Sequence, residues 1–185
     1  MDEQQLNEKD EQKPRYNRIR LLYVAVATIA VVAAATAGIR QWMATSDIAD
    51  EVSNVTRLAT TIKRTKDLVK GYEGLDNSVA LRHDAIPHTM RRSVDAAGRV
   101  DIFTVWDGAV VIGRGDSDQT FSVEYRAVPP DACRQLIKTQ RSAGWASIRV
   151  GTGQGARVIK PSDNASEVRG ACRSMPGSIR FDSES

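Results

Sequence analysis

The stretch from Leu21 to Ile39 reads LLYVAVATIAVVAAATAGI and contains no charged residue over its 19 positions. As a helix it would span roughly 28 Å at about 1.5 Å per residue, close to the thickness of a bilayer's hydrocarbon core. Much of the stretch is alanine. One interpretation is that alanine is simply tolerated in an anchor, and the other is that small residues let such helices pack closely against copies of themselves. The stretch predicts a transmembrane anchor at residues 21–39.

The residues on either side of this stretch predict its orientation. Residues 13–20 hold four basic residues and no acid, whereas Arg40 alone follows the stretch directly. The positive-inside bias therefore predicts a cytoplasmic leader at residues 1–20 and an extracytoplasmic remainder. The alternative is a cleaved secretory signal, because Ala35-Thr36-Ala37 resembles a cleavage site. The apolar run is longer than usual for such a signal, which favours a retained anchor in the inner membrane.

Composition narrows the classes of function. The 185 residues carry 26 Lys+Arg and 23 Asp+Glu, and 41% of them are hydrophobic, as in a globular protein. No basic block exceeds two residues, so we expect no nucleic-acid partner. The two cysteines and two histidines match no common zinc spacing, and no catalytic or nucleotide motif stands out. We therefore expect no enzyme activity, no cofactor and no metal site.

Residues 40–70 predict an amphipathic continuation of the anchor helix, with Gly71 as its stop. Residues 41–70 lack Gly and Pro, and an apolar stripe recurs at spacings of four and three: Ile48, Val52, Val55, Ala59 and Ile62. The opposite, polar face is assigned Asp47, Asp50, Glu51, Arg57, Lys63 and Lys70. A coiled-coil stalk would fit this period. We favour packing against the protein's own sheet, which otherwise has no long helix to cover it.

Residues 71–185 predict a globular head of class α+β with an antiparallel sheet. Residues 71–98 look irregular, and His83 and His88 are interpreted as ordinary loop residues. Alternating strands are expected at residues 99–106 and 109–113 around an Asp107-Gly108 turn, at 121–127, 145–150, 156–160 and 178–182. In the third strand, Phe121, Val123, Tyr125 and Ala127 are expected to face inward. A short helix that opens at Pro129-Pro130 and ends at Gly144 is expected to carry one stripe of residues: Cys133, Leu136, Ile137 and Gln140.

The cysteines, Cys133 and Cys172, predict a disulfide. Both follow the anchor, so they lie in an oxidising compartment, where two free buried thiols are the less favoured alternative. The bond would close a loop of about 40 residues and contribute roughly 4 kcal/mol.

Two short motifs match functional signatures, but each is interpreted more simply as a turn or a loop. Residues 151–155, GTGQG, lack the lysine of a phosphate-binding loop and are interpreted as a hairpin loop. Residues 114–117, RGDS, match an integrin-binding tetrapeptide but are also good turn chemistry.

In order and spacing, several segments resemble the type IV pilins, and locally the PilS-type branch of the type IVb pilins. These segments are residues 85–90 (AIPHTM), 105–111 (VWDGAVV), 121–133 (FSVEYRAVPPDAC), 171–172 (AC) and 177–181 (GSIRF). The resemblance covers about residue 21 to 185. It implies a long N-terminal helix packed on an antiparallel head with a C-terminal disulfide loop.

The resemblance also implies a function. The chain would be a structural subunit of a type IVb pilus, inserted in the inner membrane and assembled into a surface filament for attachment or conjugation. Its partners would be copies of itself, other pilins, membrane lipid, the assembly machinery and a prepilin peptidase. The usual glycine before the apolar segment is missing, since the first glycine is Gly38. This departure leaves open an accessory subunit, or processing at another residue. The alternative function is a single-pass periplasmic domain that binds a partner without polymerising.

Overall fold

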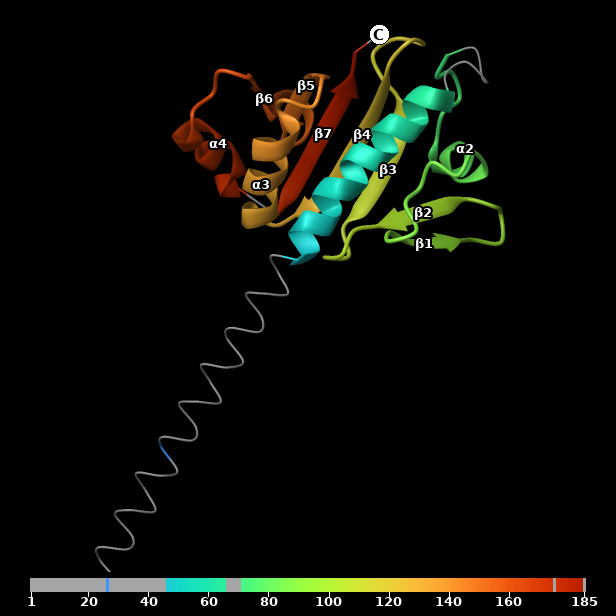
Figure 1. Cartoon of the computed structure of the whole chain (residues 1–185), viewed down its shortest axis with the longest axis horizontal. Coiled ribbons are helices and arrows are strands. Elements are labelled where there is room, and N and C mark those ends of the chain that lie inside the picture. Colours follow the sequence, from blue (N-terminus) through green and yellow to red (C-terminus); the bar gives the residue numbers. More distant parts are fainter. Residues whose placement is uncertain (1–25, 27–45, 66–70, 175, 185) are drawn as a thin grey trace, which may run out of the picture. The chain divides into compact units, whose positions relative to one another are not determined.

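The computed structural model describes Val26 and residues 46–65, 71–174 and 176–184 (Figure 1). The chain divides into two units, Met1–Thr45 and Ser46–Ser185, and the fold described below is that of the second. The predicted leader and, apart from Val26, the predicted anchor lie outside the described residues. Within the described ranges, no helix combines the length and the apolar character needed to cross a membrane.

A helix at residues 46–65 lies along one face of the sheet, as Figure 1 shows. Val55, Leu58 and Ile62 are completely buried, and the partly buried hydrophobic residues of this helix pack against the same core: Ile48, Val52 and Ala59. The predicted packing of this helix on the head's own sheet is therefore confirmed. The apolar stripe predicted from the sequence omitted Leu58, which lies at the centre of the contact.

The sheet has seven strands in the order β1-β2-β3-β4-β7-β5-β6, and every neighbouring pair is antiparallel. Its strands are β1 (Arg91–Val94), β2 (Val100–Phe103), β3 (Ala109–Arg114), β4 (Phe121–Val128), β5 (Trp145–Val150), β6 (Arg157–Ile159) and β7 (Gly177–Ser183). Strand β7, the last in the sequence, lies between β4 and β5 and joins them. The predicted α+β class with an antiparallel sheet is confirmed.

The loop between β2 and β3 is longer than the tight turn predicted from Asp107-Gly108. Strand β2 ends at Phe103, and the loop closes where the Thr104 N–H donates to the Gly108 carbonyl at 2.8 Å. A Cβ on Gly108 would lie 2.0 Å from the Arg126 carbonyl oxygen, so this position requires glycine. Asp107 has a φ of +63°, which is a turn conformation and not a strand conformation. Strand β2 is therefore shorter than predicted, because it was expected to reach Trp106.

Strand β4 follows the predicted alternation only as far as Tyr125. Phe121, Val123 and Tyr125 are buried, but Ala127 is exposed, so its predicted inward position is wrong. The pairing with β7 shifts between Tyr125 and Val128, where Ala127 takes a φ of +52°. This bulge inserts an extra residue, and Val128 points into the core instead.

Five elements among the described residues of the head were not predicted. The region 71–98, expected to be irregular, contains α2 (Asn77–Arg82) and β1, and α4 (Ala165–Ala171) leads into the 3₁₀ helix η2 (Cys172–Ser174). Asn164 caps α4 in a reciprocal box with Glu167, a spacing visible in the sequence. The helix after Pro129 is α3 (Pro130–Gln140), which begins where expected but ends before the predicted stop at Gly144. Residues 153–155 of the β5–β6 loop form a 3₁₀ turn, η1 (Gly153–Gly155).

Cys133 of α3 and Cys172 of η2 are joined by a disulfide, with a Cα–Cα distance of 5.9 Å. Both are completely buried. The bond links the α4–η2 segment to α3. Helices α3 and α4 lie side by side, on the side of the sheet that holds β5 and β6 (Figure 1). We call this part of the head, α3 with α4 and η2, the disulfide lobe.

Candidate functional site

A polar contact holds the first half of the 46–65 helix to the head. Glu51 is completely buried, and its Oε1 accepts the Val105 N–H at 2.9 Å. Asn54 donates to Glu51 Oε2 at 3.4 Å, and its own Oδ1 accepts the Thr89 hydroxyl at 2.6 Å. The sequence assigned Glu51 to the polar face of the helix, which is wrong. The loop between β2 and β3 covers this position and supplies it with a backbone donor.

Burial changes the acidity of this contact. Loss of water raises the pKa of Glu51 above its ordinary value, and the bonds from Val105 and Asn54 oppose this only in part. The neighbouring acids Asp50 and Asp47 raise the pKa of Glu51 further. The Tyr125 hydroxyl is buried without a hydrogen-bond partner among the described residues, and burial followed by the charge of Glu51 raises the pKa of Tyr125. The site therefore disfavours the ionised form of Glu51 more than water does.

We expect Glu51→Gln to raise the melting temperature at pH 7 by a few degrees. A raised pKa means that the folded protein binds more protons than the unfolded chain between about pH 4.3 and the raised value. Stability from this group is thus present at low pH and is lost as pH rises through the folded pKa. Glutamine cannot ionise but can still accept the Val105 N–H, so the variant's advantage should shrink as pH falls. Thermal unfolding of the full chain in neutral detergent from pH 4 to pH 8 measures this.

The matched control is Asp50→Asn, which changes an exposed neighbouring acid on the same helix. It should shift the melting temperature much less than the change at Glu51. If Glu51→Gln instead melted below the parent by a similar margin at every pH, the ionised carboxylate would be a net stabilising acceptor.

A second polar contact links three elements through Gln140 at the end of α3. Its amide nitrogen donates to the Val52 carbonyl oxygen at 3.2 Å and to the Thr56 hydroxyl at 3.0 Å. Its carbonyl oxygen accepts the Trp145 indole N–H of β5 at 3.0 Å. These three bonds explain the burial of Gln140: two connect the disulfide lobe to the N-terminal helix, and the third connects it to β5.

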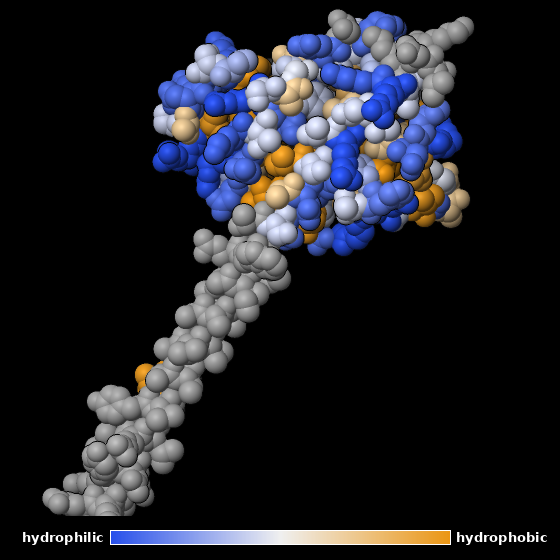
Figure 2. Space-filling model, in the orientation of Figure 1, coloured by the Kyte–Doolittle hydropathy of each residue, from blue (hydrophilic) through white to orange (hydrophobic). Residues whose placement is uncertain are grey.

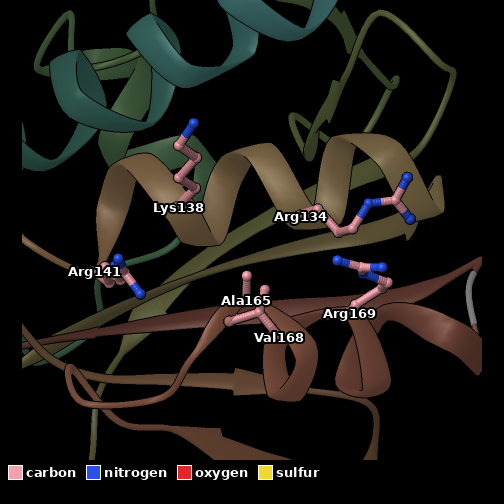
Figure 3. A pocket seen from close by; sticks show the side chains of 6 residues that line it. All are labelled: Arg134, Lys138, Arg141, Ala165, Val168 and Arg169. Carbon is pink, nitrogen blue, oxygen red and sulfur yellow. The ribbon is translucent and has the colours of Figure 1, made fainter.

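A cavity with a volume of about 480 Å³ lies in the disulfide lobe, between α3 and α4. Four of its lining residues are basic and two are small or apolar (Figure 3): Arg134, Lys138, Arg141 and Arg169, with Ala165 and Val168. We call this cavity the basic pocket. Arg134 and Lys138 of α3 and its C-cap Arg141 are spaced i, i+4 and i+7, which puts them on one side of the helix beside its buried stripe.

Sequence reasoning missed the basic pocket. The spacing of the α3 basic residues was a usable signal, but α4 was not predicted, so the fourth basic residue had no known position. The hydrophilic residues of this lobe cover much of the surface over α3 and α4 in Figure 2.

Apart from the two bonded cysteines, the histidines and the RGDS motif singled out from the sequence lie in separate parts of the head. His83 ends α2 and His88 lies in an exposed loop, and the described residues contain no group of His, Cys, Asp and Glu able to hold a metal ion. In the RGDS motif, Arg114 pairs with Asp118 at 2.6 Å, and Asp116 pairs with Arg149 of β5 at 2.9 Å. These internal ion pairs agree with the interpretation of the motif as a turn.

A family model and a solved structure are similar to this chain. Residues 45–178 match a family model described as PilS N terminal. The solved crystal structure of type IV b pilin from Salmonella typhi is similar in fold, with a TM-score of 0.57 and 20% sequence identity. That similarity covers 74% of this chain and 99% of the pilin chain. No curated protein sequence matches the chain.

Proposed function

Because the chain belongs to the PilS family and has the fold of a type IVb pilin, we propose that it is a pilus subunit anchored in the inner membrane and assembled into a surface filament. The family and the fold are those of structural proteins rather than enzymes. The observation that carries the proposal is the family match over residues 45–178, which includes both the 46–65 helix and nearly all of the head.

The sequence before the head supports the membrane part of this proposal. The uncharged stretch of residues 21–39 is long enough to cross a bilayer, and the basic residues precede it. We propose that residues 1–20 lie in the cytoplasm and that the head lies outside the inner membrane. A disulfide in the head agrees with an oxidising compartment.

In the proposed mechanism, assembly exchanges lipid contacts of the apolar segment for contacts with the same segment of neighbouring subunits. Small residues suit such close packing of helices. A head-to-tail contact that does not close on itself generates a helical filament. The partners are therefore other copies of this chain, other pilins, the assembly machinery and a prepilin peptidase, and the filament would serve attachment or conjugation.

Filament assembly is tested in the host bacterium under conditions where surface filaments are seen by electron microscopy. We expect an antibody against the head to detect the chain in filaments sheared from the cells, and to lose that signal in Val31→Arg. A charge at the centre of an apolar span opposes both insertion and helix packing. Val31→Leu is the matched control and should keep the signal. A chain that stays wholly in the membrane fraction while filaments are present would favour the alternative, an anchored periplasmic domain that binds a partner without polymerising.

A further inference from the structure

We propose that the basic pocket binds an anionic saccharide that carries sulfate or phosphate ester groups at two positions. This inference concerns ligand binding by the head alone and goes beyond filament assembly. It rests on the charges, the spacing and the donor chemistry of the pocket's lining residues.

The positive charge of the pocket's lining residues is only partly neutralised by nearby carboxylates. Arg134 pairs with Asp131, but Arg141 donates to the backbone carbonyl of Asp163 at 3.0 Å rather than to a carboxylate. The Asp163 carboxylate pairs with Arg157 at 3.7 Å, outside the pocket lining. The remaining nearby acid, Glu167, accepts the Asn164 N–H at 2.7 Å at the start of α4. Asp131 thus offsets one lining cation, Arg134, whereas the carboxylates of Asp163 and Glu167 are engaged outside the pocket lining.

The disulfide holds these like charges together. Cys133 adjoins Arg134 on α3, and Cys172 lies three residues after Arg169. The two helices cannot separate to relieve the repulsion between their basic side chains without breaking this covalent link. A site whose cations are already in place loses less conformational freedom when an anion binds.

The positions of the charges indicate an extended ligand with two anionic groups. In Figure 3 the side chains of Arg134 and Arg169 lie at one end of the pocket and that of Arg141 at the other. Arg141 caps the end of α3 seven positions after Arg134, which corresponds to about 10 Å along the helix. Ala165 and Val168 occupy the space between these ends. This uncharged centre can contact the C–H faces of a sugar ring.

The donor chemistry favours a saccharide over a peptide or a nucleic acid. Guanidinium and ammonium groups only donate hydrogen bonds, so they match ester oxyanions and sugar oxygens but leave the N–H groups of a peptide unpaired. The described lining contains no aromatic side chain on which a nucleobase could stack. Its volume of about 480 Å³ falls within the range of small-molecule sites.

The test is isothermal titration of the full chain, in neutral detergent at low ionic strength, with a sulfated heparin tetrasaccharide. A phosphorylated disaccharide is titrated in parallel to separate phosphate from sulfate esters, and the desulfated tetrasaccharide, sodium sulfate and a polyglutamate peptide serve as comparison probes. The pocket variant is Arg141→Gln with Arg169→Gln. The matched control is Lys63→Gln with Arg92→Gln, which removes the same charge from exposed positions outside the pocket lining.

We expect an ester-bearing saccharide to bind, the pocket variant to weaken that binding about 10- to 100-fold, and the control to stay within about twofold. The variant Arg141→Lys with Arg169→Lys, which keeps the charge but loses the planar fork, should lie between them. Equal melting temperatures for all variants would show that each is folded. If the glutamine variant is unfolded, the binding measured with the lysine variant decides the test instead. Absence of binding by both saccharides, or an equal loss in the control, would overturn the proposal. The proposal would also be overturned if sodium sulfate or polyglutamate bound as tightly as the saccharide and depended in the same way on Arg141 and Arg169.

Discussion

Val55→Asp and Ile62→Asp should each lower the melting temperature of the chain by more than 10 °C. Both side chains are completely buried in the core between the helix and the sheet. An aspartate there would leave a charge without a partner in an apolar environment, at a cost of several kcal/mol. For a chain of this size, each 1 kcal/mol corresponds to about 2–4 °C in the melting temperature. Thermal unfolding of the full chain at low concentration, in neutral detergent, measures the effect.

The matched control is Ser53→Asp, which introduces the same charge on the exposed side of the same helix. It should melt within about 2 °C of the parent, because exposed substitutions change stability by less than about 0.5 kcal/mol. If both core variants also melted within about 2 °C of the parent, the helix would not be held by the sheet. A free-standing coiled-coil stalk would then describe it better.

Replacement of both cysteines, Cys133→Ala with Cys172→Ala, is expected to destabilise the head by about 4 kcal/mol in the chain-entropy model. The bond joins residues 39 positions apart, so its loss releases a long loop in the unfolded chain. It also frees α4 and η2 from α3 in the folded protein. We therefore expect hydrogen exchange to speed up most in α4, and the melting temperature to fall.

The parent chain incubated with a reducing agent provides a control without any substitution, and it should melt close to the double variant. Non-reducing peptide mapping of the natively isolated protein checks the premise directly. Recovery of both thiols in the free form would remove the basis of this prediction, as would a double variant that melts with the parent.

Local patterns in the sequence were sufficient to predict many of the elements. The alternation of Phe121, Val123 and Tyr125 predicted a strand with one buried face, and the prolines before α3 predicted a helix start. The same alternation failed at Ala127, because a bulge shifts the period by one residue and leaves no mark in hydrophobicity. The position of β7 in the middle of the sheet depends on pairing with strands far away in the sequence, which periodicity does not reveal.

The candidate sites were harder to predict for a related reason. Glu51 looks like a solvent-facing acid on a helix, and only the loop that carries Val105 makes its burial tolerable. The basic pocket needs two helices from separate parts of the chain. The reciprocal cap of Asn164 and Glu167 would have predicted α4, and the disulfide would then have placed Arg169 near α3.

The strand order sets a requirement on the sequence of events during biogenesis. Strand β4 and strand β5 are both paired with β7 and not with each other, so β7 is the seam between two partial sheets, β1–β4 and β5–β6. Because β7 is the last of the seven strands in chain order, the two partial sheets cannot be joined into one sheet until residues 177–183 have been delivered to the compartment in which the head folds. Under the proposed export, the head would therefore close in a late step, and the edges of β4 and β5 that pair with β7 would stay exposed until then.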